Sequence, residues 1–187
     1  MREGRVEEIR NRRGLLKAVG LLLPAVPLAL SPVAALARTR RTRELRFYHT
    51  HTSEKLAVVY AEDGAYIPQA LDEINHLLRD FRSGAVHPID PRLLDVLHDV
   101  QAMSGSSGRY EIISAFRSPA TNEMLRHKSS GVAQKSLHLQ GQAVDVRLEG
   151  LATSNLRRAA LSLGRGGVGY YPDSDFVHLD TGRVRAW

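Results

Sequence analysis

Apolar residues recur along the chain at two spacings, which predict a mixture of strands and helices. Runs that alternate or are rich in β-branched residues predict strands, and apolar residues three and four positions apart predict helices with one buried face. The strands are expected at residues 45–51, 56–60, 65–67, 110–116, 142–148, 167–171 and 176–179. The helices are expected to begin at Pro68, Pro91, Pro119 and a cap at Thr153 or Ser154, the last one ending at Gly164. This order indicates an α+β fold with a mainly antiparallel sheet and flanking helices.

Residues 1–37 follow neither pattern and are predicted to be a signal peptide. Arg12 and Arg13 precede an apolar stretch, which is typical of the twin-arginine (Tat) export route. Prolines interrupt that stretch, and it closes at residues 35–37 with a small-x-small pattern that suits a signal peptidase. An uncleaved membrane anchor is the alternative. Cleavage would leave a mature domain at residues 38–187 in the periplasm, with no stable membrane span.

Charge and composition narrow the class of protein. The formal net charge is +6, of which residues 1–37 supply six basic and three acidic side chains, so the rest of the chain carries +3. A basic run at residues 38–46 either binds an anionic polymer or lipid head groups, or is a solvated leader. No aromatic residue is interleaved in that run, so nucleic-acid binding is not expected. The chain has no cysteine, which excludes a thiolate zinc site and a cysteine nucleophile.

The strongest chemical pattern is a split set of metal ligands. Residues 136–145 read S-x-H-x-x-G-x-A-x-D, which contains His138 and Asp145, and His178 follows about thirty residues later. A histidine taken alone is more often an ordinary surface or core residue. Two imidazoles and one carboxylate together make a three-ligand zinc site with one position left for water, as in catalytic zinc. The other close histidine pair, His49 and His51, has no suitably spaced carboxylate.

These segments carry a resemblance to a known family. Residues 113–119, 136–145 and 167–182 resemble the M15-type zinc peptidases, and most closely their DUF882 branch. The resemblance implies the fold shared by D-Ala-D-Ala carboxypeptidases and the Hedgehog signalling domain. It also implies Zn²⁺ held by His138, Asp145 and His178, and hydrolysis of peptide cross-links in peptidoglycan. Arg117 would then face the substrate, where it would clamp a carboxylate or stabilise an oxyanion.

The general base is the part of the resemblance that this sequence does not reproduce. Many M15 peptidases carry Glu-x-x-His at the last ligand, whereas here the position of the glutamate is Asp175, which is one methylene shorter. Asp180 is the rival, because residues two apart on a strand share a face and Asp180 lies two after His178. Asp180 would act either as the base or as a partner that holds a ligand histidine, and we prefer it to Asp175.

By this resemblance, the protein is expected to be an exported, zinc-dependent murein endopeptidase that cuts cross-links between the stem peptides of peptidoglycan, with those joining two diaminopimelate residues as one candidate bond. A D,D- or L,D-carboxypeptidase of the same fold is the alternative within the class. A non-catalytic zinc-binding or wall-binding module is the alternative outside it, since one fold can carry different functions.

Overall fold

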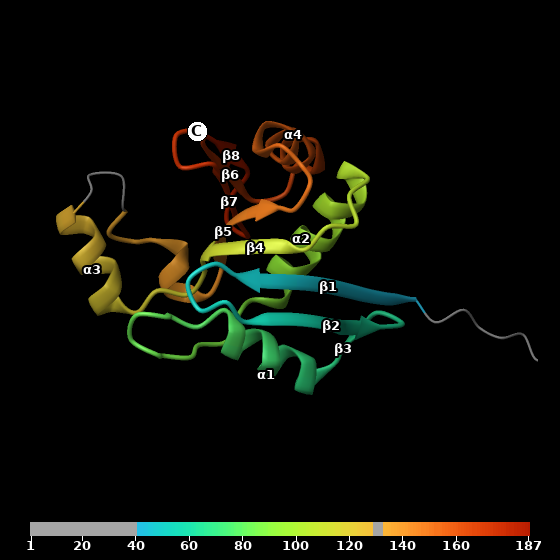
Figure 1. Ribbon diagram of the computed structural model, residues 1–187, viewed down its shortest axis with the longest axis horizontal. Helices are drawn as coiled ribbons and strands as arrows, with labels where there is room; N and C mark the ends of the chain where they lie inside the picture. The colour runs from blue at the N-terminus through green and yellow to red at the C-terminus, as the bar shows by residue number, and fades with distance from the viewer. Residues whose placement is uncertain (1–40, 129–132) are drawn as a thin grey trace, which may run out of the picture. The chain divides into compact units, whose positions relative to one another are not determined.

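The computed structural model describes residues 41–128 and 133–187, and within them the chain forms one eight-stranded sheet with four α-helices and one 3₁₀ helix (Figure 1). The strands are β1 (Thr42–His49), β2 (Lys55–Glu62), β3 (Ala65–Tyr66), β4 (Tyr110–Ser114), β5 (Ala143–Leu148), β6 (Gly167–Tyr171), β7 (Phe176–Asp180) and β8 (Arg185–Ala186). The helices are α1 (Pro68–Leu77), α2 (Pro91–Ser104), α3 (Pro119–Lys128), α4 (Thr153–Leu163) and the 3₁₀ helix η1 (Leu137–Gln140).

The sheet has the order β3-β2-β1-β4-β5-β7-β6-β8. Every neighbouring pair is antiparallel except β1 with β4 and β6 with β8, which are parallel. The predicted α+β class with a mainly antiparallel sheet is therefore confirmed. Because β5 lies between β4 and β7, the two motifs that are distant in sequence meet in the middle of the sheet.

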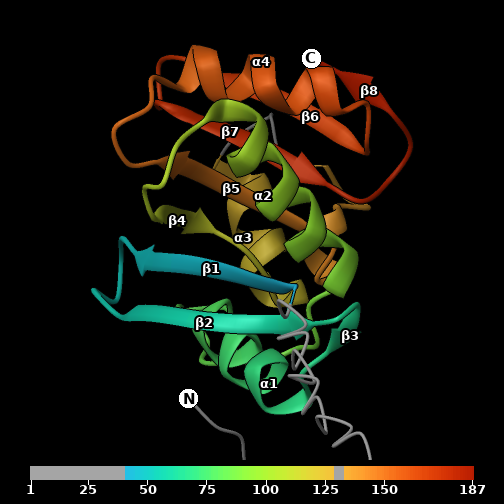
Figure 2. The same cartoon turned by 90° about the vertical axis from the view of Figure 1, so that its right-hand side faces the viewer.

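Helices cover the sheet on both sides (Figures 1 and 2). Helices α2 and α4 pack on each other and on one face, where α2 contacts β1 and β7 and α4 contacts β5, β6 and β7. Helix α3 lies on the opposite side, next to η1. The apolar stripe predicted for α2 is fully buried in this core and consists of Leu93, Leu94, Leu97 and Val100.

The N-cap of α4 and a short strand near the C-terminus differ from the sequence prediction. The N-cap of α4 is Ala152, not Thr153 or Ser154, since the Thr153 hydroxyl donates to Asp175 Oδ1 (2.8 Å). Strand β8 was not predicted, because two residues are too short to display an alternating pattern. Its pairing with β6 nevertheless places Trp187 at the candidate site described below.

The predicted signal peptide, residues 1–37, lies outside the described residues. Across 41–128 and 133–187, no helix is both long enough and apolar enough to cross a bilayer.

Candidate metal centre

Asp145 and His178 lie directly opposite each other on neighbouring strands. Antiparallel β5 and β7 pair with Asp145 in register with His178. Side chains that are opposite on an antiparallel pair project from the same face, with Cβ atoms about 4.5–5.5 Å apart. The register of the sheet therefore fixes the distance between a carboxylate and an imidazole that are thirty-three residues apart in sequence.

His138 reaches the same point from η1, the 3₁₀ helix that leads into β5. The Ser136 hydroxyl caps this helix by accepting a hydrogen bond from the His138 amide (3.4 Å). Gly141 ends it in a left-handed conformation, with φ +64°, and lies so close to the chain before α2 that an added Cβ would stand 2.3 Å from the Pro88 carbonyl oxygen. The S-x-H-x-x-G part of the motif is thus a capped turn that requires glycine.

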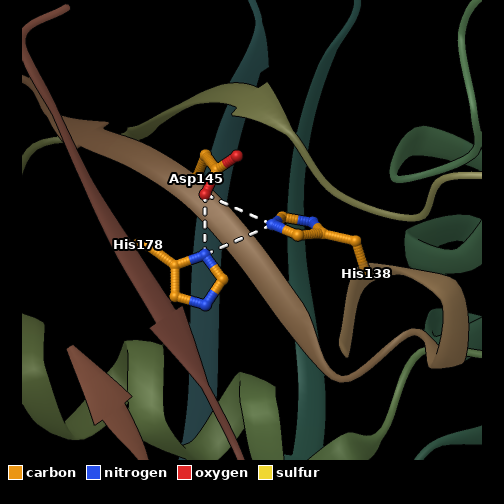
Figure 3. Close-up of side chains that lie close together, drawn as sticks. All are labelled: His138, Asp145 and His178. Carbon is orange, nitrogen blue, oxygen red and sulfur yellow. Dashed lines mark hydrogen bonds and ion pairs between the residues drawn. The ribbon is translucent and has the colours of Figure 1, made fainter. Parts of the chain in front are cut away.

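Three possible ligand atoms converge in the buried space between these elements (Figure 3). The Nδ1 atom of His178 lies 2.8 Å from Asp145 Oδ1 and 3.2 Å from His138 Nε2. The third side of the triangle, from His138 Nε2 to Asp145 Oδ1, measures 3.3 Å. The structure therefore brings together the three residues that the sequence singled out as metal ligands.

The other nitrogen of each imidazole is already committed. His138 Nδ1 lies 2.6 Å from the Ala115 carbonyl oxygen, which can only accept, so this nitrogen carries the proton. His178 Nε2 lies 3.0 Å from Asp180 Oδ2 and donates to that carboxylate. Both rings therefore turn their remaining nitrogens toward Asp145, which places three possible ligand atoms around one point. A bound cation would satisfy all three, and histidine ligands held from behind by an acceptor are typical of metal sites.

The charge states of the three residues follow from their burial and their contacts. Burial is the main reason that the pKa of His138 is lowered, which favours the neutral ring that a metal needs. Burial acts against the charged form of His178 too, but Asp145 and Asp180 outweigh it and raise the pKa of His178. Burial alone would raise the pKa of Asp145, yet the two histidines hold it well below its usual range. The carboxylate is thus ionised, and it supplies the negative charge that favours a divalent cation.

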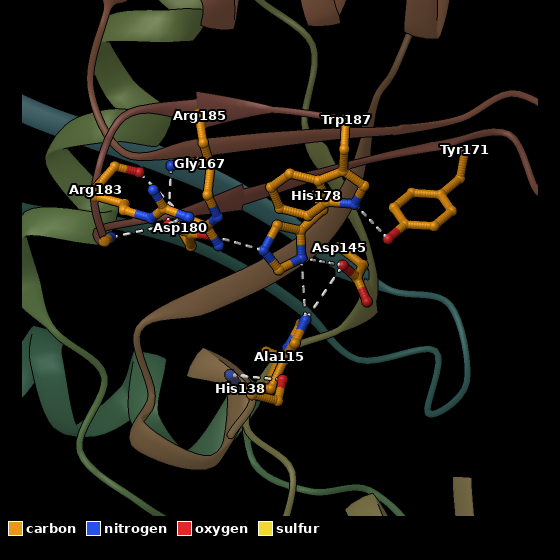
Figure 4. A network of polar contacts seen from close by, with 12 residues as sticks. Ala115, His138, Asp145, Gly167, Tyr171, His178, Asp180, Arg183, Arg185 and Trp187 are labelled. Carbon is orange, nitrogen blue, oxygen red and sulfur yellow. Dashed lines mark hydrogen bonds and ion pairs between the residues drawn. The ribbon is translucent and has the colours of Figure 1, made fainter. Parts of the chain in front are cut away.

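Asp180 is completely buried and uses both of its oxygens (Figure 4). Oδ1 accepts from the amides of Gly167 (2.9 Å) and Gly182 (2.8 Å) and from Arg185 (3.1 Å). Oδ2 accepts from Arg185 (2.6 Å) and from His178 Nε2. Burial alone would raise the pKa of Asp180, but these hydrogen bonds outweigh it and hold the pKa below the usual range. The residue predicted as base or as holding partner therefore lies behind His178, on the side away from the ligand atoms.

Asp175 does not lie with the three candidate ligands. It sits at φ +50° in the turn between β6 and β7, where its carboxylate accepts from Thr153 (2.8 Å) and contacts Arg147 (3.4 Å). Its side chain is 60% exposed. The positive φ turns this residue toward the start of α4, a placement that the Glu-x-x-His comparison did not anticipate.

Arg117 lies beside the candidate centre and contacts its carboxylate. One terminal nitrogen donates to Asp145 Oδ2 at 2.5 Å, and Nε donates to the Ser114 hydroxyl at 2.8 Å. The guanidinium therefore fixes the oxygen of Asp145 that does not face the histidines. Arg117 also lines the cleft, so the same side chain both pairs with Asp145 and forms part of the cleft wall.

The three candidate ligands lie at the floor of a cleft of about 480 Å³. Its walls include three aromatic side chains, Tyr171, Phe176 and Trp187. The indole of Trp187 stands 5.2 Å from the His178 ring, and its Nε1 donates to the Tyr171 hydroxyl (2.8 Å). The sequence did not predict Trp187 at the site, because only the pairing of β8 with β6 brings that residue there.

A buried His-Asp-His group, with both rings held from behind and a cleft beside it, is the arrangement typical of metallohydrolases with a three-ligand catalytic site. Comparison with known proteins agrees with this class. Residues 37–187 match the model of an M15 peptidase family described as peptidoglycan L,D-endopeptidase MepK.

Individual relatives match over almost their full length. The chain is 45% identical to the peptidoglycan L,D-endopeptidase MepK of Escherichia coli K12 over 177 residues, which cover 95% of this chain and 97% of the relative. It is 36% identical to the probable peptidoglycan L,D-endopeptidase MepK of Haemophilus influenzae over 179 residues, or 95% and 96% of the two chains. The protein therefore belongs to the MepK family of M15-type peptidases, and the resemblance stated from the sequence is confirmed. No solved structure matches the chain.

Proposed function

We propose that this peptidase is a zinc-dependent murein endopeptidase, which hydrolyses peptide cross-links of peptidoglycan. The observation that carries the proposal is the convergence of His138 Nε2, Asp145 Oδ1 and His178 Nδ1, with the second nitrogen of each ring occupied. The relatives are named L,D-endopeptidases, which favours an amide between an L and a D centre, as in a cross-link between two diaminopimelate residues.

Zinc is the metal that this donor set suits best. Two imidazole nitrogens and one carboxylate are ligands of borderline softness, and three protein ligands leave an open position. When bound there, zinc would supply a Lewis acid that polarises the scissile carbonyl and lowers the pKa of water to about 7.

The residues around the candidate metal centre would orient its ligand side chains. Arg117 holds Asp145 from one side and Asp180 holds His178 from the other, so the ligand atoms are aimed before a metal arrives. We assign Asp180 this holding role rather than the role of base, because both of its oxygens are occupied. Among the residues that the structure describes, the lining of the cleft has no carboxylate other than Asp145.

The charge of the cleft suits an anionic substrate. Among the described residues, three cationic side chains line it, Arg117, Lys135 and Arg185, against one side-chain carboxylate, that of Asp145. Stem peptides of peptidoglycan carry free carboxylates, which such a lining attracts. Export would bring the enzyme to this substrate, and we include in the proposal a Tat signal at residues 1–37, a mature domain at 38–187 and a periplasmic location.

The test is cleavage of purified muropeptide dimers by the purified protein, with bound metal quantified, with and without a chelator. We expect stoichiometric zinc and chelator-sensitive release of uncross-linked monomers. His178→Ala should lose both the metal and the activity. His127→Ala, a change at a histidine whose side chain is 76% exposed, should lose neither.

Other outcomes would reassign the function. Loss of a single terminal residue from the substrate would identify a carboxypeptidase instead. Stoichiometric zinc without cleavage of any muropeptide would identify a binding module. Wild-type turnover by His178→Ala would contradict the metal assignment itself.

A further inference from the structure

The two consecutive tyrosines of β6 have different surroundings. Neighbouring residues of a strand point to opposite faces. Tyr170 packs against the hydrophobic core, with the Arg157 guanidinium 5.2 Å from its ring centre. Tyr171 lines the cleft and stacks on Phe176, the residue that pairs with it on the neighbouring strand β7, with ring centres 4.5 Å apart. One tyrosine is therefore structural, and the other is displayed beside the candidate metal centre.

The hydroxyl of Tyr171 is oriented by a donor. The indole nitrogen of Trp187 can only donate, so in the 2.8 Å contact the Tyr171 oxygen is the acceptor (Figure 4). Across the described residues, the hydroxyl proton of Tyr171 has no acceptor within hydrogen-bond distance. The hydroxyl thus accepts from the protein and keeps its own proton for a group that enters the cleft.

Trp187 is itself fixed on several sides. Its backbone pairs with β6, donating to the Val168 carbonyl (3.2 Å) and accepting from the Tyr170 amide (3.0 Å). The Arg185 guanidinium stands 4.8 Å from the indole, and the centre of the His178 ring lies 5.2 Å from it. Gly169 makes this packing possible, because an added Cβ there would lie 2.7 Å from the indole. The donor that orients Tyr171 is therefore held through both its backbone and its ring, although 47% of the residue is exposed, and it links the hydroxyl to the candidate ligand His178.

Amide hydrolysis needs such a group. The carbonyl oxygen gains negative charge as water adds, and a preorganised donor aimed at it stabilises the transition state more than the substrate. Arg117, the donor expected from the sequence, is engaged by Asp145 and Ser114. We propose that Tyr171 is a catalytic residue, whose hydroxyl donates a hydrogen bond to the developing oxyanion, and that Trp187 is the positioning residue that orients it. The proton stays on Tyr171 throughout.

The inference rests on the proposed peptidase function, and paired tyrosine variants test it. Tyr171→Phe keeps the ring and removes only the hydroxyl, and Tyr170→Phe is the matched control on the same strand. With a muropeptide dimer and saturating zinc, Tyr171→Phe should lower kcat about 10²-fold with KM within about twofold of the wild type. Zinc stoichiometry and affinity should not change. Tyr170→Phe should keep kcat within about twofold.

Trp187→Phe tests the orienting step, because it removes the indole N–H and leaves the Tyr171 hydroxyl in place. We expect a fall in kcat of about tenfold, smaller than that of Tyr171→Phe. Trp187 is the single tryptophan of the chain, so an unchanged emission spectrum in Tyr171→Phe would show that the indole has not moved.

Several results would overturn the inference. Tyr171→Phe with wild-type kcat would do so, as would a fall in kcat shared equally by Tyr170→Phe, or a rise in KM alone, which would make Tyr171 a binding wall. In each of these cases the wild type still cleaves the dimer, and the proposed function stands. A wild type that cleaves no muropeptide would instead refute the proposed function, and the inference with it.

Discussion

Replacing Asp180 with asparagine distinguishes a holding role from a catalytic one. The amide oxygen can replace only one carboxylate oxygen, and the amide NH₂ takes the other position. At Oδ1 the NH₂ would meet three donors, whereas at Oδ2 it would meet two, from Arg185 and His178. The NH₂ should therefore take the Oδ2 position. His178 would then move its proton from Nε2 to Nδ1, which is the atom aimed at the metal.

The size of the effect follows from the contacts that are lost. Hydrogen bonds to a charged group contribute about 1.5–3 kcal/mol each. At the Oδ2 position the bond from Arg185 is lost and the bond with His178 is reversed and loses its charge. Because the Arg185 side chain is 29% exposed and can rehydrate, we expect a loss of about 2–4 kcal/mol in the free energy of unfolding. For a domain of this size that loss lowers Tm by about 5–15 °C. Loss of a partner that holds a ligand histidine should weaken zinc binding about 10–100-fold.

The assay has three readouts: thermal unfolding, zinc titration against a chromophoric competitor, and muropeptide turnover at saturating zinc. If Asp180 holds His178, saturating zinc should restore kcat to within about tenfold of the wild type. If Asp180 is the base, zinc affinity should be normal and kcat should fall about 10²–10⁴-fold. That second pattern would refute the reasoning. Asp175→Asn is the control, at an exposed carboxylate whose loss should leave stability within about 0.5 kcal/mol and turnover unchanged.

Two further predictions concern Asp80 and Gly141, which support the segments around the candidate site. Burial alone would raise the pKa of Asp80, but hydrogen bonds from Ser118 and neighbouring residues outweigh burial and lower that pKa. The ionised carboxylate therefore stabilises the fold fully above about pH 4, and this stabilisation is lost as the pH falls below that value. Asp80→Asn should therefore destabilise the protein by about 1.5–3 kcal/mol at pH 7, and the difference should shrink as the pH falls from about 4 to about 2. Denaturant titrations that gave equal differences at pH 7 and at about pH 2 would contradict this. Gly141→Ala should lower the free energy of unfolding by about 1–3 kcal/mol because of its positive φ, and by more because the new Cβ meets the Pro88 carbonyl. Zinc affinity and Tm should therefore fall together. Gly105→Ala is the control, at a positive φ with open space around it, and should lower Tm alone.

Local sequence determined much of the secondary structure. Proline at the first helical position predicted the starts of α1 and α2, and glycine in a left-handed conformation predicted the end of α4. These rules act over a few residues, so no distant contact is needed to apply them. The same holds for the S-x-H-x-x-G turn, in which a serine cap and Gly141 place His138 by local geometry.

The sequence by itself thus determined the elements, the fold class and the identity of the three candidate ligands, because each is encoded in short-range periodicity or in a compact motif. Only the tertiary structure decided which groups surround them. The register of β5 against β7 set Asp145 opposite His178, and the fold placed Asp180 behind the His178 ring. The turn before β7 placed Asp175 against Thr153 at the start of α4, apart from the candidate ligands. The pairing of β8 with β6 brought Trp187 to the cleft. These contacts join segments far apart in the chain, and their geometry depends on the pairing of whole strands, which no local pattern specifies.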